Sequence, residues 1–224
     1  MKNLTIDVGN TNILFCLFNN RRIIKHERVS INNLNFDKLN FFKSYYMMST
    51  SNILISSVVP DCNKILVKFF NKEMINFLFL KDVLGKINIK SNIKNKKEIG
   101  DDRLANTIYA KELLKRSVII IDFGTATTLD VVDKNGIYDG GIITPGIDLS
   151  LNTLNNKTAK LPLVKFKKTK KIIGHNTKQA IQSGFFWGYY SMINGLIEKI
   201  KNELNDNFKL ILTGGNANHF KNLF

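Results

Sequence analysis

Ile6-Asp7-Val8-Gly9-Asn10-Thr11 is the stretch that decides the fold, because it returns as Ile121-Asp122-Phe123-Gly124-Thr125-Ala126. Each copy ends an apolar run, Leu4–Val8 or Val118–Phe123, and a second apolar run follows each glycine. This order predicts a strand, a tight turn and a second strand, built twice in one chain. Two such hairpins, each with an aspartate at the turn, are suited to holding the phosphates of a nucleotide and their cations.

The residue types at the two turns indicate how they would bind a ligand. We expect glycine at each corner to adopt a positive φ and to let a ligand approach the backbone. Asp7 and Asp122 are expected to be buried at strand ends, where a cation would relieve the cost of an unpaired charge. Short polar residues that would face phosphate oxygens follow the corners: Asn10, Thr11, Thr125, Thr127 and Thr128. One Asp-x-Gly is common in ordinary hairpins, whereas two copies in register favour a nucleotide site.

The hydrophobic pattern predicts two similar halves of mixed α/β structure. In the first half, strands are expected at 3–8, 12–19, 22–29, 52–58 and 75–80, and helices at 35–47 and 61–72. In the second half, strands are expected at 117–123, 127–133, 137–144 and 209–213, and helices at 146–155 and 176–203. A helix at 100–116 would bridge lobes formed by residues 1–99 and 117–224, with a cleft between them. The Lys/Asn-rich region 86–98 should be exposed.

The long helix from about residue 176 has Asn176 or Thr177 as its expected N-cap. Gly184, Gly188 and Gly195 lie along this helix, although internal glycines cost helix stability. Glycines inside a helix usually allow another backbone to approach the helix closely. Two interpretations remain open: contact with a second helix across a dimer axis, or core packing within one subunit.

Two further motifs carry polar residues beside glycine. Gly100-Asp101-Asp102-Arg103 opens the bridging helix, where acidic residues could simply match the helix dipole. An aspartate in a cleft could instead accept the proton of an alcohol during phosphoryl transfer, while an arginine holds an anionic group of the substrate. Thr213-Gly214-Gly215-Asn216 follows an apolar strand. It fits either adenosine binding or an ordinary strand-to-helix turn.

Composition narrows the class of protein. The 224 residues carry a formal charge of +15, which can indicate nucleic acid or an anionic surface. The densest basic run, Lys165–Lys171, lacks interleaved aromatic residues, so we interpret it as a solvated loop or edge strand and expect no nucleic-acid partner. The two cysteines, Cys16 and Cys62, form no disulfide framework, which fits a reducing cytoplasm. No signal peptide or membrane-spanning run is found, and the three histidines lack metal-ligand spacing.

These motifs, taken together, resemble the type III pantothenate kinase family, a branch of the acetate and sugar kinase, heat-shock 70 and actin superfamily. The resemblance rests on Asp7–Asn12, Ser56–Pro60, Gly100–Arg103, Asp122–Thr128, Gly140–Gly146, Gly174–Thr177, Ser183-Gly184 and Thr213–Gly215, in order and over nearly the whole chain. It implies duplicated ribonuclease H-like (actin-like ATPase) lobes with a nucleotide cleft between them. It also implies ATP-dependent phosphorylation of the primary hydroxyl of pantothenate, the first step of coenzyme A biosynthesis.

The resemblance assigns roles to individual residues. Asp102 is expected to be the general base, and Asp122 is expected to bind a monovalent cation, K⁺ or NH₄⁺. Pantothenate would contact Gly100, Asp101, Asp102, Arg103 and Thr177, with Arg103 on its carboxylate. ATP, with Mg²⁺, would contact Asp7, Val8, Gly9, Asn10, Thr11, Asn12, Ile13, Leu14 and Thr125. The resemblance further implies a cytoplasmic homodimer whose substrate site lies near the interface.

The chain departs from the family pattern at three places. Ile93 and Lys96 stand where the family has a tyrosine that touches pantothenate and a proline. Asp101 replaces a small residue, which puts a like charge beside the expected base. The chain also ends soon after Thr213-Gly214-Gly215, where family members continue with a strand and a helix, so a shortened second lobe is expected.

Two alternatives to this activity remain. One is another small-molecule kinase or phosphatase of the same superfamily, against which Gly100–Arg103 and Asn176-Thr177 argue. The other is a non-catalytic regulator or nucleic-acid-binding protein, which the net charge of +15 keeps open. A pure binding protein would have no chemical need for Asp7, Asp102, Asp122 and Thr125 together.

Overall fold

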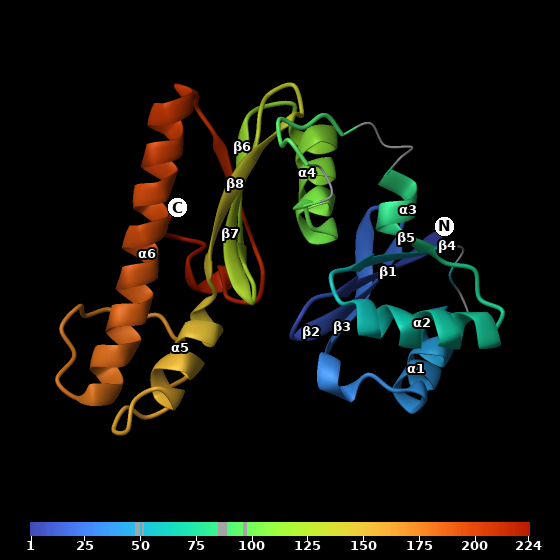
Figure 1. Ribbon diagram of the computed structural model, residues 1–224, viewed down its shortest axis with the longest axis horizontal. Coiled ribbons are helices and arrows are strands. Elements are labelled where there is room, and N and C mark those ends of the chain that lie inside the picture. Colours follow the sequence, from blue (N-terminus) through green and yellow to red (C-terminus); the bar gives the residue numbers. More distant parts are fainter. Residues whose placement is uncertain (48–49, 51, 85–88, 96–97) are drawn as a thin grey trace. The chain divides into compact units, whose positions relative to one another are not determined.

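Two β-sheets organise the chain, one in each of two structural units (Figure 1). The computed structural model describes residues 1–47, 50, 52–84, 89–95 and 98–224. The N-terminal unit comprises Met1–Ile89 and Asn95–Asn106, and the C-terminal unit comprises Lys90–Lys94 and Thr107–Phe224. The expected mixed α/β fold with two sheets is confirmed.

The N-terminal sheet has the strand order β3-β2-β1-β4-β5. Its strands are β1 (Lys2–Val8), β2 (Asn12–Asn19), β3 (Arg22–Ser30), β4 (Asn52–Ser57) and β5 (Leu78–Phe79). The first three strands form an antiparallel meander, and β4 joins β1 in parallel. The meander therefore brings the hairpin between β1 and β2 to the same edge as the C-terminal end of β4.

The C-terminal sheet repeats this arrangement in the order β8-β7-β6-β9. Its strands are β6 (Val118–Phe123), β7 (Ala126–Val132), β8 (Tyr138–Pro145) and β9 (Lys209–Thr213). β6, β7 and β8 form the antiparallel meander, and β9 joins β6 in parallel. β6 thus corresponds to β1 and β9 to β4, as the repeated motif predicts.

Helices connect and cover the strands. In the N-terminal unit these are α1 (Phe36–Phe42), a π-helical turn (Lys43–Met47), α2 (Pro60–Lys72) and α3 (Leu80–Leu84). In the C-terminal unit these are α5 (Ile147–Asn156) and α6 (Thr177–Leu204). Short 3-10 helices occur at Ile31–Asn33 in the N-terminal unit and at Ala217–His219 in the C-terminal unit. α4 (Asp101–Leu114) begins in the N-terminal unit, and its residues from Thr107 onward belong to the C-terminal unit.

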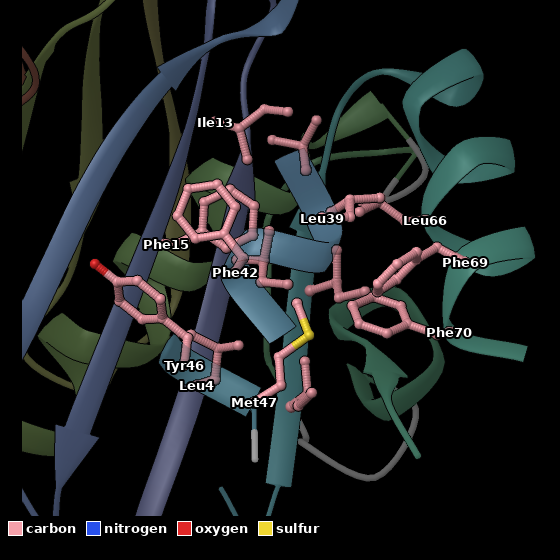
Figure 2. Packing of buried hydrophobic residues seen from close by; sticks show 14 of the residues in the cluster. Leu4, Ile13, Phe15, Leu39, Phe42, Tyr46, Met47, Leu66, Phe69 and Phe70 are labelled. Atoms are coloured by element: carbon pink, nitrogen blue, oxygen red, sulfur yellow. The ribbon is translucent and has the colours of Figure 1, made fainter. Parts of the chain in front are cut away.

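The core of the N-terminal unit is rich in aromatic side chains, which lie between the sheet and helices α1 and α2 (Figure 2). Phe15 on β2 stacks on Phe42 of α1 with ring centroids 3.9 Å apart. Phe69 and Phe70 of α2 are fully buried and meet edge to face. These contacts hold the outer layer of helices to one face of β1 and β2, so the hairpin between those strands starts from a packed core.

A second core fixes the C-terminal sheet. Val118 to Ile121 are all buried, which is typical of a central strand covered on both faces. α5 and α6 contribute Ile147, Phe186 and Ile193 to the cluster that packs on this sheet. The short strand β5 is the main departure from the expected pattern, which placed a strand at 75–80. Residues after α2 instead close that helix, because Met74 adopts a positive φ and the N–H of Ile75 bonds the carbonyl of Phe70.

Candidate active site

Asp7 stands near the end of β1, where it pairs with Leu14 of β2 and Ser56 of β4. Ile6 and Val8 are buried, so Asp7 points to the opposite face of the strand and its side chain is exposed. The expectation that Asp7 is buried is therefore wrong. Although the side chain still reaches solvent, nearby protein atoms remove part of its hydration, and this desolvation raises the pKa of Asp7.

Three neighbours modify the carboxyl group of Asp7. A hydrogen bond from the Ser56 side chain lowers its pKa, the negative charge of Asp102 raises it, and Arg28 lowers it. Asp102 and Asp7 therefore interact within the N-terminal unit, although they come from α4 and β1. Two carboxylates in one place form an oxygen donor set that suits a hard divalent cation.

The motif Gly100–Arg103 forms the start of α4, with Asp101 and Asp102 in its first turn. The Oδ1 atom of Asp102 accepts a hydrogen bond from the backbone N–H of Arg103 at 2.8 Å. A Cβ at position 100 would lie 2.5 Å from that Oδ1 atom and 3.7 Å from Val58. Glycine at position 100 therefore leaves room for the carboxylate of Asp102 to fold back beside the end of β4.

Asp101 is directed differently from Asp102. Burial raises the pKa of Asp101, while a hydrogen bond from the backbone of Ser57 and the charge of Lys81 lower it. The negative charge of Asp102 raises it by less than these effects. Asp101 thus ties the start of α4 to the end of β4, rather than acting only as a like charge beside Asp102.

The turn of the first hairpin is closed by a hydrogen bond from the N–H of Gly9 to the carbonyl of Asn12, at 3.0 Å. Asn10 and Thr11 are exposed at the tip, whereas the side chains of Val8 and Ile13 are buried in the core. Val8 and Ile13 can therefore offer only backbone atoms to a ligand. Among the described glycines, positive φ is found at Gly136, Gly140 and Gly214 and not at the two corner glycines, so that expectation for Gly9 and Gly124 is wrong.

Asp122 holds the corresponding place in the C-terminal unit, where it pairs with Thr128 of β7 and Thr213 of β9. Its side chain is half-buried and, by the alternation along the strand, points to the face opposite to that of Ile121 and Phe123. A Cβ at Gly124 would lie 3.4 Å from the Oδ1 atom of Asp122, and a Cβ at Gly214 would lie 2.4 Å from it. Gly214 has a φ of +89°, which a residue with a side chain rarely adopts.

Gly146 completes a cradle of three glycines around this hairpin. Its N–H donates to the carbonyl of Thr125 at 3.0 Å. A Cβ at position 146 would lie 2.2 Å from that carbonyl oxygen and 2.5 Å from the carbonyl oxygen of Gly124. The carboxylate and carbonyl oxygens around these glycines are of the kind that hard cations prefer. Gly146 ends the sequence motif Gly140–Gly146, but its contact with Thr125 arises only in the folded chain.

Of the two threonines that follow in β7, Thr127 does not face a ligand as expected. Thr127 pairs with Phe123, is fully buried and has a hydroxyl with no hydrogen-bond partner among the described residues. Thr128 donates its hydroxyl to the carboxylate of Asp130 at 3.3 Å. The strand alternation explains the difference, since Thr127 points to the core and Thr128 to a neighbouring side chain.

Thr177 is the first residue of α6 and is exposed. The expected N-cap at Asn176 is confirmed, because its side chain accepts from the N–H of Gln179 at 2.9 Å. The side chain of Gln179 reaches back to the N–H of His175 at 3.0 Å. These reciprocal bonds resemble a capping box and fix the start of the helix.

The two substitutions upstream of Gly100 have different outcomes. Ile93 lies in the C-terminal unit, and its Cδ1 atom would be 3.4 Å from a Cβ at Gly140, so it packs beside β8. Lys96 lies outside the described residues. The backbone of this segment is held to Tyr138, which accepts from Asn92 and donates to Lys90, each at 3.0 Å.

The glycines of α6 decide between the two interpretations offered for them. A Cβ at Gly184, Gly188 or Gly195 would meet nothing within 4 Å in the described part of the chain. Core packing within one subunit is therefore the wrong interpretation for these glycines. The basic run Lys165–Lys171 contains no helix or strand, so its interpretation as a loop is confirmed. The described helices also include none that is long and apolar enough to cross a membrane.

Comparison with known proteins gives a consistent match. A family model described as type III pantothenate kinase matches residues 3–199. A type III pantothenate kinase of Sulfurihydrogenibium sp. is 44% identical over 182 residues, covering 79% of this chain and 71% of the relative. A type III pantothenate kinase of Pelagibacter ubique is 41% identical over 225 residues, covering 96% of this chain and 88% of the relative.

Solved structures support the fold. A Campylobacter jejuni protein described as a Baf family transcriptional activator has a TM-score of 0.63 at 23% identity and covers 99% of this chain and 87% of its own. Component A of (R)-2-hydroxyglutaryl-CoA dehydratase from Acidaminococcus fermentans has a TM-score of 0.52 at 13% identity, covering 98% and 85%. At these identities the likeness concerns the fold alone, which is the actin-like ATPase fold.

Proposed function

The chain belongs to the type III pantothenate kinase family, and we propose that it phosphorylates pantothenate with Asp102 as the general base. The reaction transfers the γ-phosphoryl group of ATP to the primary hydroxyl, which gives 4′-phosphopantothenate for coenzyme A biosynthesis. Match to the family over almost the whole chain supports the reaction. The interaction between Asp102 and Asp7 is the single structural observation that supports the assignment of the base.

Asp102 has the chemistry and the support that a base needs. Its Oδ1 atom is held by the N–H of Arg103, so the carboxylate has a defined orientation. We propose that the Oδ2 atom of Asp102 accepts the proton of the substrate hydroxyl while the hydroxyl oxygen attacks phosphorus. Phosphoryl transfer depends mainly on positioning and charge stabilisation, which the fixed start of α4 supplies.

Asp7 and the first hairpin would hold ATP together with Mg²⁺. Desolvation raises the pKa of Asp7, although Ser56 and Arg28 lower it, so the carboxylate would gain from a nearby positive charge. A divalent cation supplies that charge when bound and neutralises the phosphates. The exposed tip residues Asn10 and Thr11, with the backbone of Gly9 and Asn12, would contact phosphate oxygens through N–H groups and short side chains.

In the second hairpin, Thr125 would contact ATP and Asp122 would hold a monovalent cation. Gly124 and Gly214 bring backbone close to the carboxylate of Asp122, and Gly146 approaches the carbonyl groups of Gly124 and Thr125. Such a set of oxygen donors fits K⁺ or NH₄⁺, because neither ion demands rigid geometry. Asp122 would therefore hold the cation, and the backbone of Thr125 would be kept in place by the N–H of Gly146.

Pantothenate would bind at the start of α4 and at Thr177. Arg103 is suited to the pantothenate carboxylate, since a guanidinium can form two parallel hydrogen bonds with it. Gly100 leaves room beside Asp102, and the capped start of α6 presents the hydroxyl of Thr177. Asp101 would act indirectly, by holding the start of α4 to Ser57.

A homodimer would use the exposed face of α6. Gly184, Gly188, Ser191 and Gly195 are exposed and recur at helical spacing, so they form one stripe of small residues. Small residues let two helices approach closely. We place the dimer in the cytoplasm, since Cys16 and Cys62 are both free and buried, as suits a reducing compartment.

An assay of pantothenate phosphorylation by the purified chain with Mg-ATP tests the proposal. We expect turnover in potassium or ammonium buffer and little in sodium buffer, and we expect Asp122→Asn to lose this cation dependence. Equal turnover in all three buffers would contradict the assignment of a monovalent cation to Asp122. A folded chain that shows no turnover in any buffer would contradict the proposed reaction.

A further inference from the structure

A cavity of about 400 Å³ lies in the C-terminal unit, between the loop that precedes α6 and the first turns of that helix. Its wall carries Lys167, Lys168, Lys170, Lys171 and His175. No aspartate or glutamate is found among the described residues that line it. The cavity is therefore a concave, strongly basic surface, of a volume in the range of small-molecule sites.

The stretch of sequence that forms the cavity contains no acidic residue. Between Asp148 and Glu198 there is neither aspartate nor glutamate. Lysines in this stretch stand at positions 157, 160, 165, 167, 168, 170, 171 and 178. The positive charge of the cavity is thus a property of the whole segment, and an anionic ligand would gain from it.

The loop is held in place by buried polar side chains of α6. The Nε2 atom of Gln182 donates to the carbonyl of Lys165 at 3.1 Å. The hydroxyl of Ser183 donates to the carbonyl of Lys171 at 3.3 Å, and it also contacts the carbonyl of Ile172. Gln182 and Ser183 are only 4% and 3% exposed. The two bonds pin both ends of the lysine run, so little ordering of the backbone is left for a ligand to induce.

Close packing at Gly174 adds to this rigidity. A Cβ at position 174 would lie 2.3 Å from the backbone nitrogen of Ala180. The loop therefore passes directly over the first turn of α6. That turn contains no acidic residue. The N-terminal end of the helix dipole adds positive potential at this place.

One hydroxyl in the cavity wall is left without a partner. The Oγ1 atom of Thr169 is buried and makes no hydrogen bond to any described residue. A buried hydroxyl without a partner costs free energy, and an oxygen-rich ligand in the cavity could accept a hydrogen bond from it. This observation is independent of the charge of the lysines.

We propose that this cavity binds a small molecule that carries an oligophosphate group. Four lysines leave most of their charge unneutralised by a ligand with a single negative charge, whereas an oligophosphate presents several. Each lysine offers three N–H donors, and phosphate oxygens accept charge-assisted hydrogen bonds from them. None of the residues assigned above to ATP, pantothenate or the cation lines the cavity. Thr177, which is assigned to pantothenate, lies in the sequence between the lining residues His175 and Gln179, so the cavity adjoins that residue.

Titration calorimetry with sodium tripolyphosphate, in the absence of Mg²⁺, tests the proposal. The three proteins are the unmodified chain, Lys168→Gln/Lys170→Gln, and the control Lys68→Gln/Lys199→Gln. All four lysines are exposed, and both double variants lower the formal charge of +15 by two. The nucleotide site is common to all three proteins, so a difference between them reports on the cavity.

We expect the dissociation constant to rise at least tenfold in Lys168→Gln/Lys170→Gln and to stay within twofold in the control. Equal affinities in all three proteins would overturn the proposal, and so would an equal loss in both double variants, which would show an effect of total charge. A single-stranded oligonucleotide is titrated in parallel. If only the oligonucleotide binds, and the loop variant weakens it, the site serves nucleic acid and the proposed ligand class is wrong. Kinase activity does not enter these measurements, so they stand whether or not the proposed reaction is observed.

Discussion

Asp7 and Asp122 occupy equivalent positions in the two sheets. Each lies on the strand that is paired on one side with an antiparallel hairpin partner and on the other side with a parallel strand. On the parallel strand each aspartate faces a residue with a hydroxyl group, Ser56 for Asp7 and Thr213 for Asp122. The duplication therefore extends from the motif to its hydrogen-bonded surroundings, which the sequence repeat alone does not include.

Asp102→Asn is expected to abolish most turnover while keeping the fold and ATP binding. The amide cannot accept the hydroxyl proton, and general-base catalysis contributes about 100- to 10,000-fold to a rate. Its oxygen can still accept from the N–H of Arg103, so the start of α4 should persist. Steady-state kcat, nucleotide affinity and thermal unfolding check the three parts. A near-normal kcat would remove Asp102 from the role of base.

Asp101→Asn gives the matched comparison, because it makes the same chemical change one residue earlier. Asp101 bonds the backbone of Ser57 and lies near Lys81, so the amide can keep the hydrogen bond. We expect kcat to fall by less than about tenfold, since only a positioning contact is weakened. If this variant loses as much activity as Asp102→Asn, the two carboxylates act together and the assignment of a single base fails.

Most of the fold could be predicted from the sequence, because hydrophobic periodicity and turn glycines are local signals. β2 and β9 have the predicted bounds, and the N-cap of α6 falls at Asn176. β5 was predicted too long, because the residues after α2 serve its C-terminal cap. This cap depends on the left-handed backbone conformation of Met74. Methionine has no preference for that conformation, so the sequence does not predict it.

The site was predictable in its motifs but not in its side-chain directions. Thr127 was expected to face phosphate and instead lies in the core, because the exact register of β7 decides which of two adjacent threonines turns inward. Arg28 and Ser56 were not predicted as neighbours of Asp7, since their contact arises from strand pairing across the sheet. Gly146 likewise gains its importance only from the folded approach to Thr125.

Gly146→Ala is expected to destabilise the fold by about 1–3 kcal/mol, because the new methyl group must displace the backbone of Gly124 and Thr125. Nucleotide affinity should fall with it, since the displaced carbonyl belongs to the proposed ATP hairpin. Gly9→Ala is the control, because its Cβ would meet only the carbonyl of Asn12 at an ordinary 3.4 Å. Urea unfolding should distinguish the variants, and equal stability of the two would contradict the cradle.

The raised pKa of Asp7 predicts how stability depends on pH. The folded chain holds this proton more tightly than the unfolded chain, whose aspartate pKa is about 3.9. The contribution of Asp7 to the free energy of unfolding is therefore complete below that value and is lost as pH rises through the raised folded pKa. Asp7→Asn cannot ionise, so its stability relative to the unmodified chain should increase from about pH 3.5 to neutrality.

Asp61→Asn supplies a control of opposite sign in the same unit. A hydrogen bond from Lys64, at 2.9 Å, lowers the pKa of Asp61. Its contribution is present above the unfolded pKa and is lost as pH falls through the lowered folded value. Urea unfolding of the ligand-free chain at several pH values measures both differences. A relative stability of Asp7→Asn that stays constant with pH would show that Asp7 is not perturbed in solution.

The exposed glycine stripe of α6 predicts that Gly188→Leu separates the proposed dimer without unfolding the chain. Nothing described lies within 4 Å of a Cβ at Gly188, so a larger side chain fits the single chain, and losing a helical glycine should stabilise α6 by about 0.5–1 kcal/mol. The same side chain would hold two closely packed helices apart. Asn71→Leu, on the exposed surface of α2, adds a leucine away from the stripe. Sedimentation equilibrium should show monomers for Gly188→Leu and dimers for the unmodified chain and the control. Dimers of unchanged affinity in Gly188→Leu would place the interface elsewhere, because a leucine cannot be accommodated where two glycine faces meet.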